Sequence, residues 1–238
     1  MADQGKRLVE LRKKVDPNHL YGPTEGLELV KDLSKTKFDE TIECHVRTGL
    51  DPRHADQLVR ASVVLPAGTG KKIRVLAFAQ GESAREAEEA GADYVGGEDL
   101  VQKIQDGFLD FDVAVATPDI MGAVGRLGRV LGPRGLLPNP RTGTVSTDIG
   151  KLIKEVRAGR VEFRVDKTGV IHSVIGKASF SPDQLQQNLV ALLDAIVRAK
   201  PQAARGQYIR SIALAPAMGP SVKLDIGPTL ALVSEVAA

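Results

Sequence analysis

The hydrophobic period of the sequence changes twice, and this feature constrains the fold more than any other. Apolar and polar side chains alternate over residues 41–48 and again over 161–175, which is the period of half-buried strands. Between these stretches, short apolar runs are separated by helical segments, a pattern typical of βαβ units in a parallel sheet. The runs are 73–79, 93–95 and 113–116, and the helical segments are 83–90, 98–106, 118–130 and 147–158. The middle of the chain therefore predicts a different architecture from its two ends.

The two ends supply helices and strands that neither end could assemble into a complete layered domain alone. Their expected helices are 6–15, 23–34 and 185–196, and their expected strands are 41–48, 58–66, 161–165, 170–175, 208–215 and 221–226. The stretch Asp166-Lys167-Thr168-Gly169 predicts a tight turn that makes its two flanking strands hairpin partners. We therefore expect one discontinuous α+β domain from residues 1–67 and 159–238, with a Rossmann-like three-layer α/β domain, residues 68–158, inserted into it.

Charge is segregated along the chain, although the net charge of +2 is small. Residues 80–119 hold 11 acidic and 2 basic side chains, whereas residues 120–180 hold 11 basic and 4 acidic side chains. A block rich in arginine suits contact with phosphates, and it also suits a solvated face balanced by its acidic neighbour. Charge alone leaves both interpretations open.

Composition indicates a soluble protein of the reducing cytoplasm, without membrane contact. Apolar runs all stay well below the roughly 18 residues of a membrane span, and the first 15 residues carry charges where a signal peptide needs an apolar segment. The single cysteine, Cys44, has no partner for an internal disulfide, and its place in an alternating stretch favours a small strand residue over a nucleophile.

Two motif searches predict neither a cofactor nor a metal. The stretch Gly68-Thr69-Gly70-Lys71 lacks the serine or threonine that must follow the lysine of a phosphate-binding loop. The four histidines do not share a metal-ligand spacing. We therefore expect no nucleotide cofactor and no metal centre.

Residues 120–144 form the most unusual segment, IMGAVGRLGRVLGPRGLLPNPRTGT. Glycine and proline dominate it, so its backbone can approach a ligand closely. Its arginines can make forked contacts to phosphates, and they are Arg126, Arg129, Arg134 and Arg141. A structural loop that caps the sheet is the alternative that these residues allow.

Residues 121–145, MGAVGRLGRVLGPRGLLPNPRTGTV, closely resemble the signature of the universal large-subunit ribosomal protein L-one family, the stalk protein beside the tRNA exit site. The resemblance extends to KFDETIECHVRTGLDPR, AGADYVGGEDL, GRVEFRVDKTGVIHSVIGKASF and AMGPSVKLD, and so covers nearly the whole chain. Ala217 stands where the family pattern leads us to expect threonine, and the region 124–128 is one residue shorter than the expected form.

The resemblance implies a non-catalytic, structural protein of the large ribosomal subunit in the cytoplasm. Its discontinuous domain would be the primary binder of the rRNA stalk stem, and its inserted domain would face exit-site tRNA through the four arginines. The protein would form the mobile stalk and assist the release of that tRNA. As a free monomer, it would also repress translation by binding the leader of its own mRNA.

The resemblance also implies the residues of the rRNA site. They are Lys37, Phe38, Thr41, Glu43, His45, Asp166, Lys167, Thr168, Gly169, Met218, Gly219, Pro220 and Ser221, with Lys6, Arg7 and Arg164 neutralising phosphates. Thr41, Glu43 and His45 share one face of their strand and so offer hydroxyl, carboxylate and imidazole groups to a shallow RNA groove. Taken alone, a phenylalanine such as Phe38 is more often a core anchor than a stacking platform, and a 166–169 turn needs no ligand.

Two other function classes fit the residues considered without the resemblance. One is a small-molecule enzyme whose glycine, proline and arginine loop holds a phosphorylated substrate, although the chain offers no candidate nucleophile or base for it. The other is a scaffold that binds only proteins, which predicts no salt-sensitive affinity for RNA.

Overall fold

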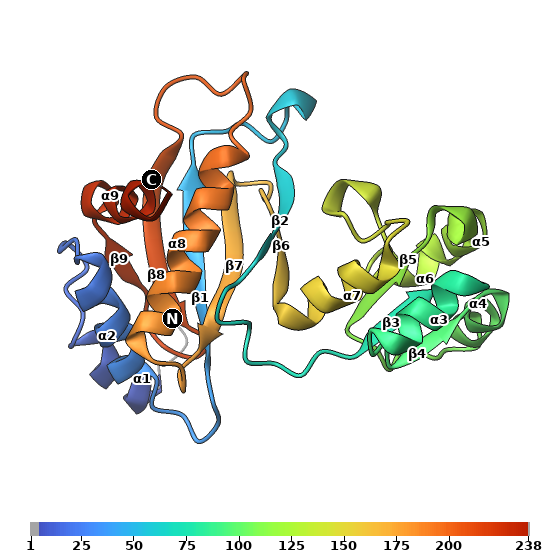
Figure 1. Ribbon diagram of the computed structural model, residues 1–238. Helices are drawn as coiled ribbons and strands as arrows, with labels where there is room; N and C mark the ends of the chain where they lie inside the picture. The colour runs from blue at the N-terminus through green and yellow to red at the C-terminus, as the bar shows by residue number, and fades with distance from the viewer. Residues whose placement is uncertain (1–4, 238) are drawn as a thin grey trace. The chain divides into compact units, whose positions relative to one another are not determined.

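The computed structural model describes residues 5–237, except for the side chains of Arg141 and residues 235–237. The chain divides into two compact units, one formed by Met1–Gly70 with Val161–Ala238 and the other by Lys71–Arg160. We call them the split unit and the inserted unit. Both contain helices and strands, as Figure 1 shows, and this confirms the predicted mixed α/β class.

The split unit is built on a four-stranded antiparallel sheet whose order is β7-β1-β8-β9. The strands are β1 Thr41–Thr48, β7 Val170–Lys177, β8 Ile209–Pro216 and β9 Val222–Leu224. The period of two sends Ile42, Cys44 and Val46 of β1 to a fully buried face, while the side chains between them stay partly exposed. Polar residues of β1 therefore gather on the opposite face.

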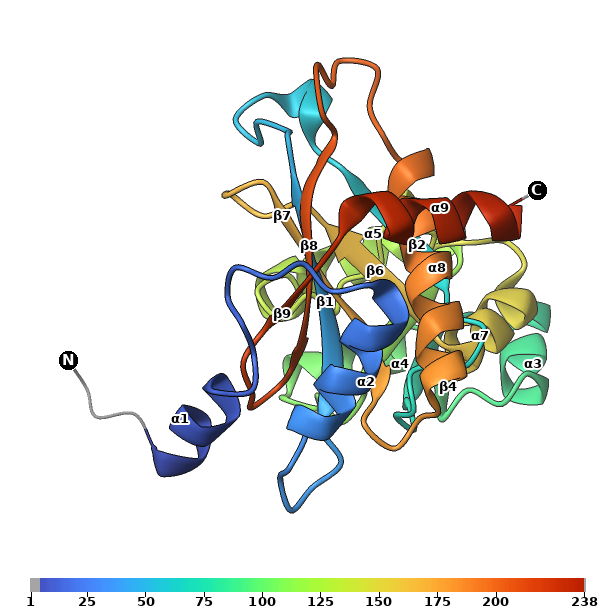
Figure 2. The same ribbon diagram turned by 90° about the vertical axis from the view of Figure 1, so that its left-hand side faces the viewer.

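Helices cover the buried face of this sheet (Figures 1 and 2). They are α2 Pro23–Leu33, α8 Pro182–Arg198 and α9 Ile226–Ala237. Leu27 of α2 and Leu189 of α8 are fully buried in one core with the apolar side chains of the sheet. Helix α8 begins with a capping box, because the Ser181 hydroxyl accepts from the Gln184 backbone N–H and the Gln184 side chain accepts from the Ser181 N–H.

A separate two-stranded sheet, β2-β6, lies beside this core. Its strands are β2 Arg60–Val64 and β6 Arg160–Arg164, and the remaining short elements are helix α1 Lys6–Arg12 and the 3-10 turn η1 Ala55–Gln57. The predicted hairpin of strands 161–165 and 170–175 forms only at its turn, and the prediction that the two strands pair along their length is wrong. Strand β6 pairs with β2 and β7 pairs with β1, while an isolated bridge joins Val165 to Ile171. The longer ladder with β1 aligns the buried faces of both strands, which fixes the register.

The inserted unit is built on a three-stranded parallel sheet of order β4-β3-β5. Its strands are β3 Val75–Phe78, β4 Tyr94–Gly96 and β5 Val113–Ala116, and its longer helices are α3 Glu82–Glu89, α4 Glu98–Gln105 and α7 Ile149–Ala158. Leu76 and Phe78 lie in one core with α4, whereas Val75 and Ala77 lie in another with α3 and α7. Helices thus cover both faces of the sheet, which is why β3 is apolar at every position.

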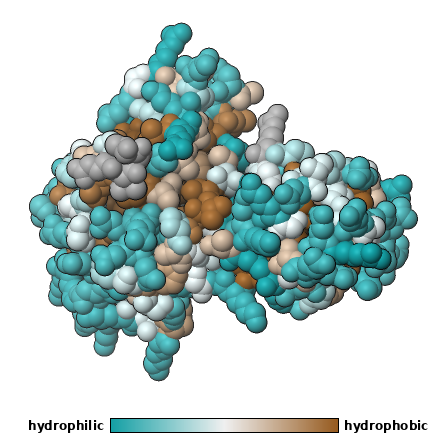
Figure 3. All heavy atoms as spheres, in the orientation of Figure 1, coloured by the Kyte–Doolittle hydropathy of each residue, from teal (hydrophilic) through white to brown (hydrophobic). Residues whose placement is uncertain are grey.

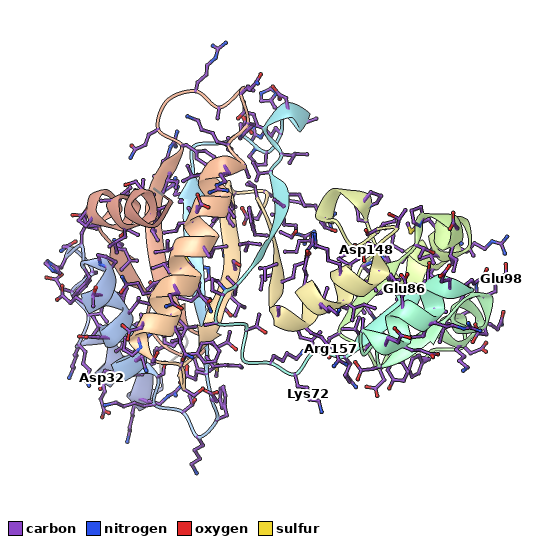
Figure 4. The ribbon with its side chains drawn as sticks, viewed as in Figure 1. Asp32, Lys72, Glu86, Glu98, Asp148 and Arg157 are labelled. Atoms are coloured by element: carbon purple, nitrogen blue, oxygen red, sulfur yellow. The ribbon has the colours of Figure 1, made fainter. Side chains whose placement is uncertain are left out.

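Local signals fix both ends of α7, which lies close to its predicted range. The Asp148 carboxylate caps the start by accepting from the Lys151 backbone N–H at 2.9 Å. Gly159 ends the helix in the left-handed conformation, with φ 107°. Asp148 and Arg157 mark the two ends of this helix in Figure 4.

The predicted helix 118–130 is instead a succession of short helical turns. They are η2 Pro118–Ile120, α5 Met121–Val124, η3 Gly125–Leu127 and α6 Gly128–Leu131, followed later by η4 Pro140–Thr142. Repeated glycines explain the interruption, because each weakens a helix by about 1 kcal/mol relative to alanine. The buried side chains of Val124, Leu127 and Leu131 still keep helical spacing, so the segment packs on the sheet as a helix would.

The C-terminal region differs from the prediction in a second way. The strand expected at 221–226 is shorter, Val222–Leu224, and helix α9 follows it at once. Thr229 is buried in this helix, and its hydroxyl donates to the Asp225 carbonyl at 2.5 Å. Within the described part of the chain, none of the helices is both long and apolar enough to cross a membrane.

Candidate nucleic-acid interface

Strand β1 carries Thr41, Glu43 and His45 on its partly exposed face. The residues between them, including Cys44, are fully buried against the helices. Burial raises the pKa of Cys44 to about 12, so the thiol stays protonated at neutral pH. The predicted role of Cys44 as a strand residue is confirmed, and the chemistry of β1 lies on its other face.

The antiparallel register places His45 directly opposite His172 of β7. Their Nδ1 atoms are 2.9 Å apart, and each Nε2 lies near a carboxylate: Glu43 at 3.7 Å from His45, and Asp166 at 3.6 Å from His172. The pKa of His45 is lowered, first because burial disfavours the imidazolium and second because His172 is close. His172 was absent from the predicted site, since the register of β1 against β7 cannot be read from the sequence.

The turn at 166–169 is fixed by its own side chains. Asp166 Oδ1 accepts from the backbone N–H groups of Thr168 and Val170, both at 2.8 Å, and the Thr168 hydroxyl donates to the same carboxylate. The N–H of Val170 and the hydrogen bonds from Thr168 lower the pKa of Asp166 to about 2. Gly169 has φ +80°, and its carbonyl accepts from the Thr48 hydroxyl at 2.7 Å. The turn is therefore rigid and attached to the end of β1.

The loop 217–221 is attached to the other end of β1. The Ala217 N–H donates to the Thr41 carbonyl at 2.9 Å, and the Gly219 N–H donates to the Pro216 carbonyl at 3.1 Å. A Cβ at Gly219 would come within 2.5 Å of Pro216 Cγ, so the tight turn requires glycine. The Arg7 guanidinium donates to the Met218 carbonyl at 3.0 Å, which brings the N-terminal helix to this loop.

Two large apolar side chains remain exposed in the loops beside Thr41. Phe38 is 57 % exposed and Met218 is 54 % exposed. The alternative that Phe38 anchors the core is therefore wrong. Both side chains are therefore accessible to a ligand of this surface. Hydrophilic residues make up most of the face of the molecule that Figure 3 shows.

Chain continuity, hydrogen bonds and strand pairing thus bring three segments to the ends of β1. Loops 36–40 and 217–221 lie at its Thr41 end, and turn 166–169 lies at its Thr48 end. Eight residues of extended chain separate these ends by roughly 23 Å. We call the partly exposed face of β1, His172 and these three segments the β1 surface.

The basic residues of the predicted rRNA site are exposed. Lys37 and Lys167 lie within the β1 surface, and Arg164 ends β6 shortly before the 166–169 turn. Lys6 and Arg7 begin α1, where Arg7 reaches the 217–221 loop. Of the remaining predicted residues, Thr168 and Ser221 are exposed, Gly219 and Pro220 are half-buried, and Gly169 is buried.

The predicted tRNA-facing arginines lie in the inserted unit, in the segment of short helical turns and the loop after it. Arg126, Arg129 and Arg134 are exposed, whereas the side chain of Arg141 lies outside the described part of the structure. The loop is held by hydrogen bonds of its own, since the Asn139 N–H donates to the Thr144 hydroxyl at 2.8 Å. The geometry is that of a basic, glycine-rich surface on a folded loop.

Across the described residues, histidine, cysteine, aspartate and glutamate side chains do not come together in any group of three or more that could hold a metal ion. The polar row of the β1 surface contains two imidazoles and two carboxylates, joined to one another rather than arranged around a common centre. Such groups can donate to and accept from ribose hydroxyls and base edges.

Comparison with family models identifies the family. Residues 30–220 match the model of the ribosomal protein L1p/L10e family. The chain belongs to this family. The match confirms the resemblance stated from the sequence, and it includes β1, the whole inserted unit and the 166–169 turn. Lys6, Arg7 and Ser221 lie outside it.

Membership of the L1p/L10e family gives the chain a structural role in the large ribosomal subunit, in the cytoplasm, with rRNA as its binding partner. The family is one of structural ribosomal proteins and not of enzymes. The small-molecule enzyme considered from the sequence is therefore set aside in favour of RNA binding.

Proposed function

We propose that the split unit is the primary rRNA-binding domain of this L1p/L10e-family protein, and that the β1 surface grips the rRNA stalk stem. One observation supports the proposal most directly: loop 36–40 leads into β1, a hydrogen bond attaches loop 217–221 to the same end, and turn 166–169 is attached to the other end. The surface between them presents hydroxyl, carboxylate and imidazole groups. Such groups recognise the wide minor groove of RNA, where ribose hydroxyls and base edges are accessible.

Alanine substitutions test which surface binds the stem. Thr168→Ala and Met218→Ala, at opposite ends of β1, should each weaken binding of the stem by about 1–3 kcal/mol. Arg134→Ala, an exposed residue of the inserted unit, should change it little. Equal losses for all three variants in a filter-binding or calorimetric titration would show that the β1 surface is not the site.

We further propose that the inserted unit faces exit-site tRNA and assists its release as part of the mobile stalk. Exposed Arg126, Arg129 and Arg134 on a glycine-rich loop support this role, because guanidinium groups make forked contacts to phosphates. Ribosomes carrying alanine at these three positions should release deacylated tRNA from the exit site more slowly. Arg85→Ala, an exposed arginine on α3, is the matched control. An unchanged release rate in the triple variant would refute the role.

The same β1 surface supports a second proposal, that the free monomeric protein represses its own messenger. A leader that imitates the ribosomal stem would meet the same groups. Excess wild-type protein should lower translation of a reporter that carries this leader. Excess Met218→Ala protein should not repress it. Equal translation with and without excess wild-type protein would contradict autogenous control.

A further inference from the structure

Glu40 is a carboxylate buried in the split unit, only 1 % exposed, between α2 and β1. Its Oε1 accepts from the Thr36 backbone N–H at 3.2 Å, and its Oε2 accepts from the Met218 backbone N–H at 3.1 Å. Its carbonyl accepts from the Ala178 N–H at 2.8 Å. One side chain thus joins two loops that are about 180 residues apart in the sequence.

Burying a carboxylate is costly unless its oxygens accept hydrogen bonds. Here the donors belong to the two loops that carry the exposed apolar side chains of the β1 surface. Met218 is one donor itself, and Thr36 also donates its hydroxyl to the Phe38 carbonyl at 2.8 Å. Glu40 therefore fixes the backbone of the loop that carries Phe38 and the backbone of the loop that carries Met218.

The neighbouring carboxylate, Asp39, makes different contacts. It accepts from the Ser179 N–H at 3.0 Å and from the Ser179 hydroxyl at 2.8 Å, and it is exposed. Asp39 thus attaches the 36–40 loop to the connection after β7, whereas Glu40 attaches it to loop 217–221. The contact with loop 217–221 therefore belongs to Glu40 and not to Asp39.

We propose that Glu40 is a positioning residue for rRNA recognition: it holds loops 36–40 and 217–221 in one fixed relation, so that Phe38 and Met218 meet the same RNA surface. This inference rests on the proposed function of the β1 surface. Its physical basis is preorganisation, because loops that are ordered before binding lose less conformational entropy when the RNA arrives.

The test uses the full chain and the rRNA stem. Glu40→Gln keeps the shape but replaces one acceptor oxygen by an NH2 group, which cannot accept from a backbone N–H. It should weaken binding of the stem about tenfold, which corresponds to about 1.4 kcal/mol. Glu28→Gln, at an exposed glutamate of α2 outside the β1 surface, is the control and should bind within about threefold of the wild-type protein.

A double-mutant cycle separates positioning from a general loss of stability. If Glu40 acts through Met218, Glu40→Gln should cost much less affinity in a Met218→Ala background than in the wild-type protein. Additive losses would overturn the inference, as would wild-type affinity of Glu40→Gln while Met218→Ala binds weakly. Wild-type affinity of Met218→Ala itself would instead refute the proposed site, and the inference with it.

A measurement on the wild-type protein keeps the inference testable if Glu40→Gln does not fold. The Met218 amide should exchange slowly with solvent although its side chain is exposed, because its N–H is bonded to a buried carboxylate. Fast exchange of this amide would show that Glu40 does not hold the loop.

Discussion

The Nδ1 atoms of His45 and His172 lie 2.9 Å apart across the β1–β7 pair. At this distance one nitrogen must donate and the other must accept, so the contact survives when one ring is protonated and breaks when both are. Carboxylates from two elements also face the pair, Glu43 on β1 and Asp166 in the turn before β7, whereas Ala213 lies opposite His45 on β8. The two imidazoles therefore lie between carboxylates at the centre of the β1 surface.

The free energy of unfolding should fall as the pH falls below about 6.5. The pKa of His45 is lowered in the folded protein, so the unfolded chain binds its proton at a higher pH and is favoured by acid. This stabilising contribution is complete above the unfolded pKa and is lost as the pH drops toward the folded one. Urea unfolding at pH 7.5 and 5.5 should show a smaller pH effect in His45→Gln. Equal pH effects in the variant and the wild-type protein would contradict this assignment.

Much of the fold follows from the local pattern. Alternation predicted β1, and a Ser-Pro start with helical spacing predicted α8. Two features that depend on tertiary contacts were not predicted. Strand β6 pairs with β2 rather than with the following strand, and helix α9 follows β9 directly. Pairing partners depend on which apolar faces must be buried together, which no single stretch of sequence determines.

The residues of the site were likewise predictable where local spacing determines them and not where distant contacts do. Thr41, Glu43 and His45 were assigned to one strand face from their spacing alone. His172 and Glu40 were missed because their roles depend on contacts far along the chain, with His45 in one case and with Met218 in the other. Residues with long-range partners need the structure.

Asn188 should be among the most important polar residues for the stability of the split unit. It is fully buried; its Oδ1 accepts from the Ala67 N–H at 2.9 Å, and its Nδ2 donates to the Gly68 and Ile175 carbonyls. Asn188→Leu leaves these backbone groups unpaired and should cost about 2–4 kcal/mol. Gln187→Leu, on the exposed side of the same helix, should cost less than about 0.5 kcal/mol in the same urea titration. Similar losses for both variants would show that the hydrogen bonds of Asn188 contribute little.

Any side chain at Gly169 should lower the stability of the fold. Its φ is +80°, and an added Cβ would lie 3.0 Å from the Leu50 carbonyl oxygen. Gly169→Ala should therefore lose about 1–3 kcal/mol of stability. Gly206 also has a positive φ, +72°, but nothing lies within 4 Å of an added Cβ. Gly206→Ala should lose only the backbone strain, about 1 kcal/mol, in thermal or chemical unfolding. Equal losses would mean that the Leu50 contact is unimportant.

The most direct test of the account is the affinity of the full chain for the rRNA stalk stem, compared with a shuffled stem of equal length over a series of salt concentrations. If the β1 surface reads the shape and edges of a specific stem, the authentic stem should be preferred at least about a hundredfold, and this preference should persist as salt weakens both complexes. The slope against salt concentration would then give the number of phosphates neutralised. Equal, salt-labile binding to both stems would contradict specific recognition by the β1 surface.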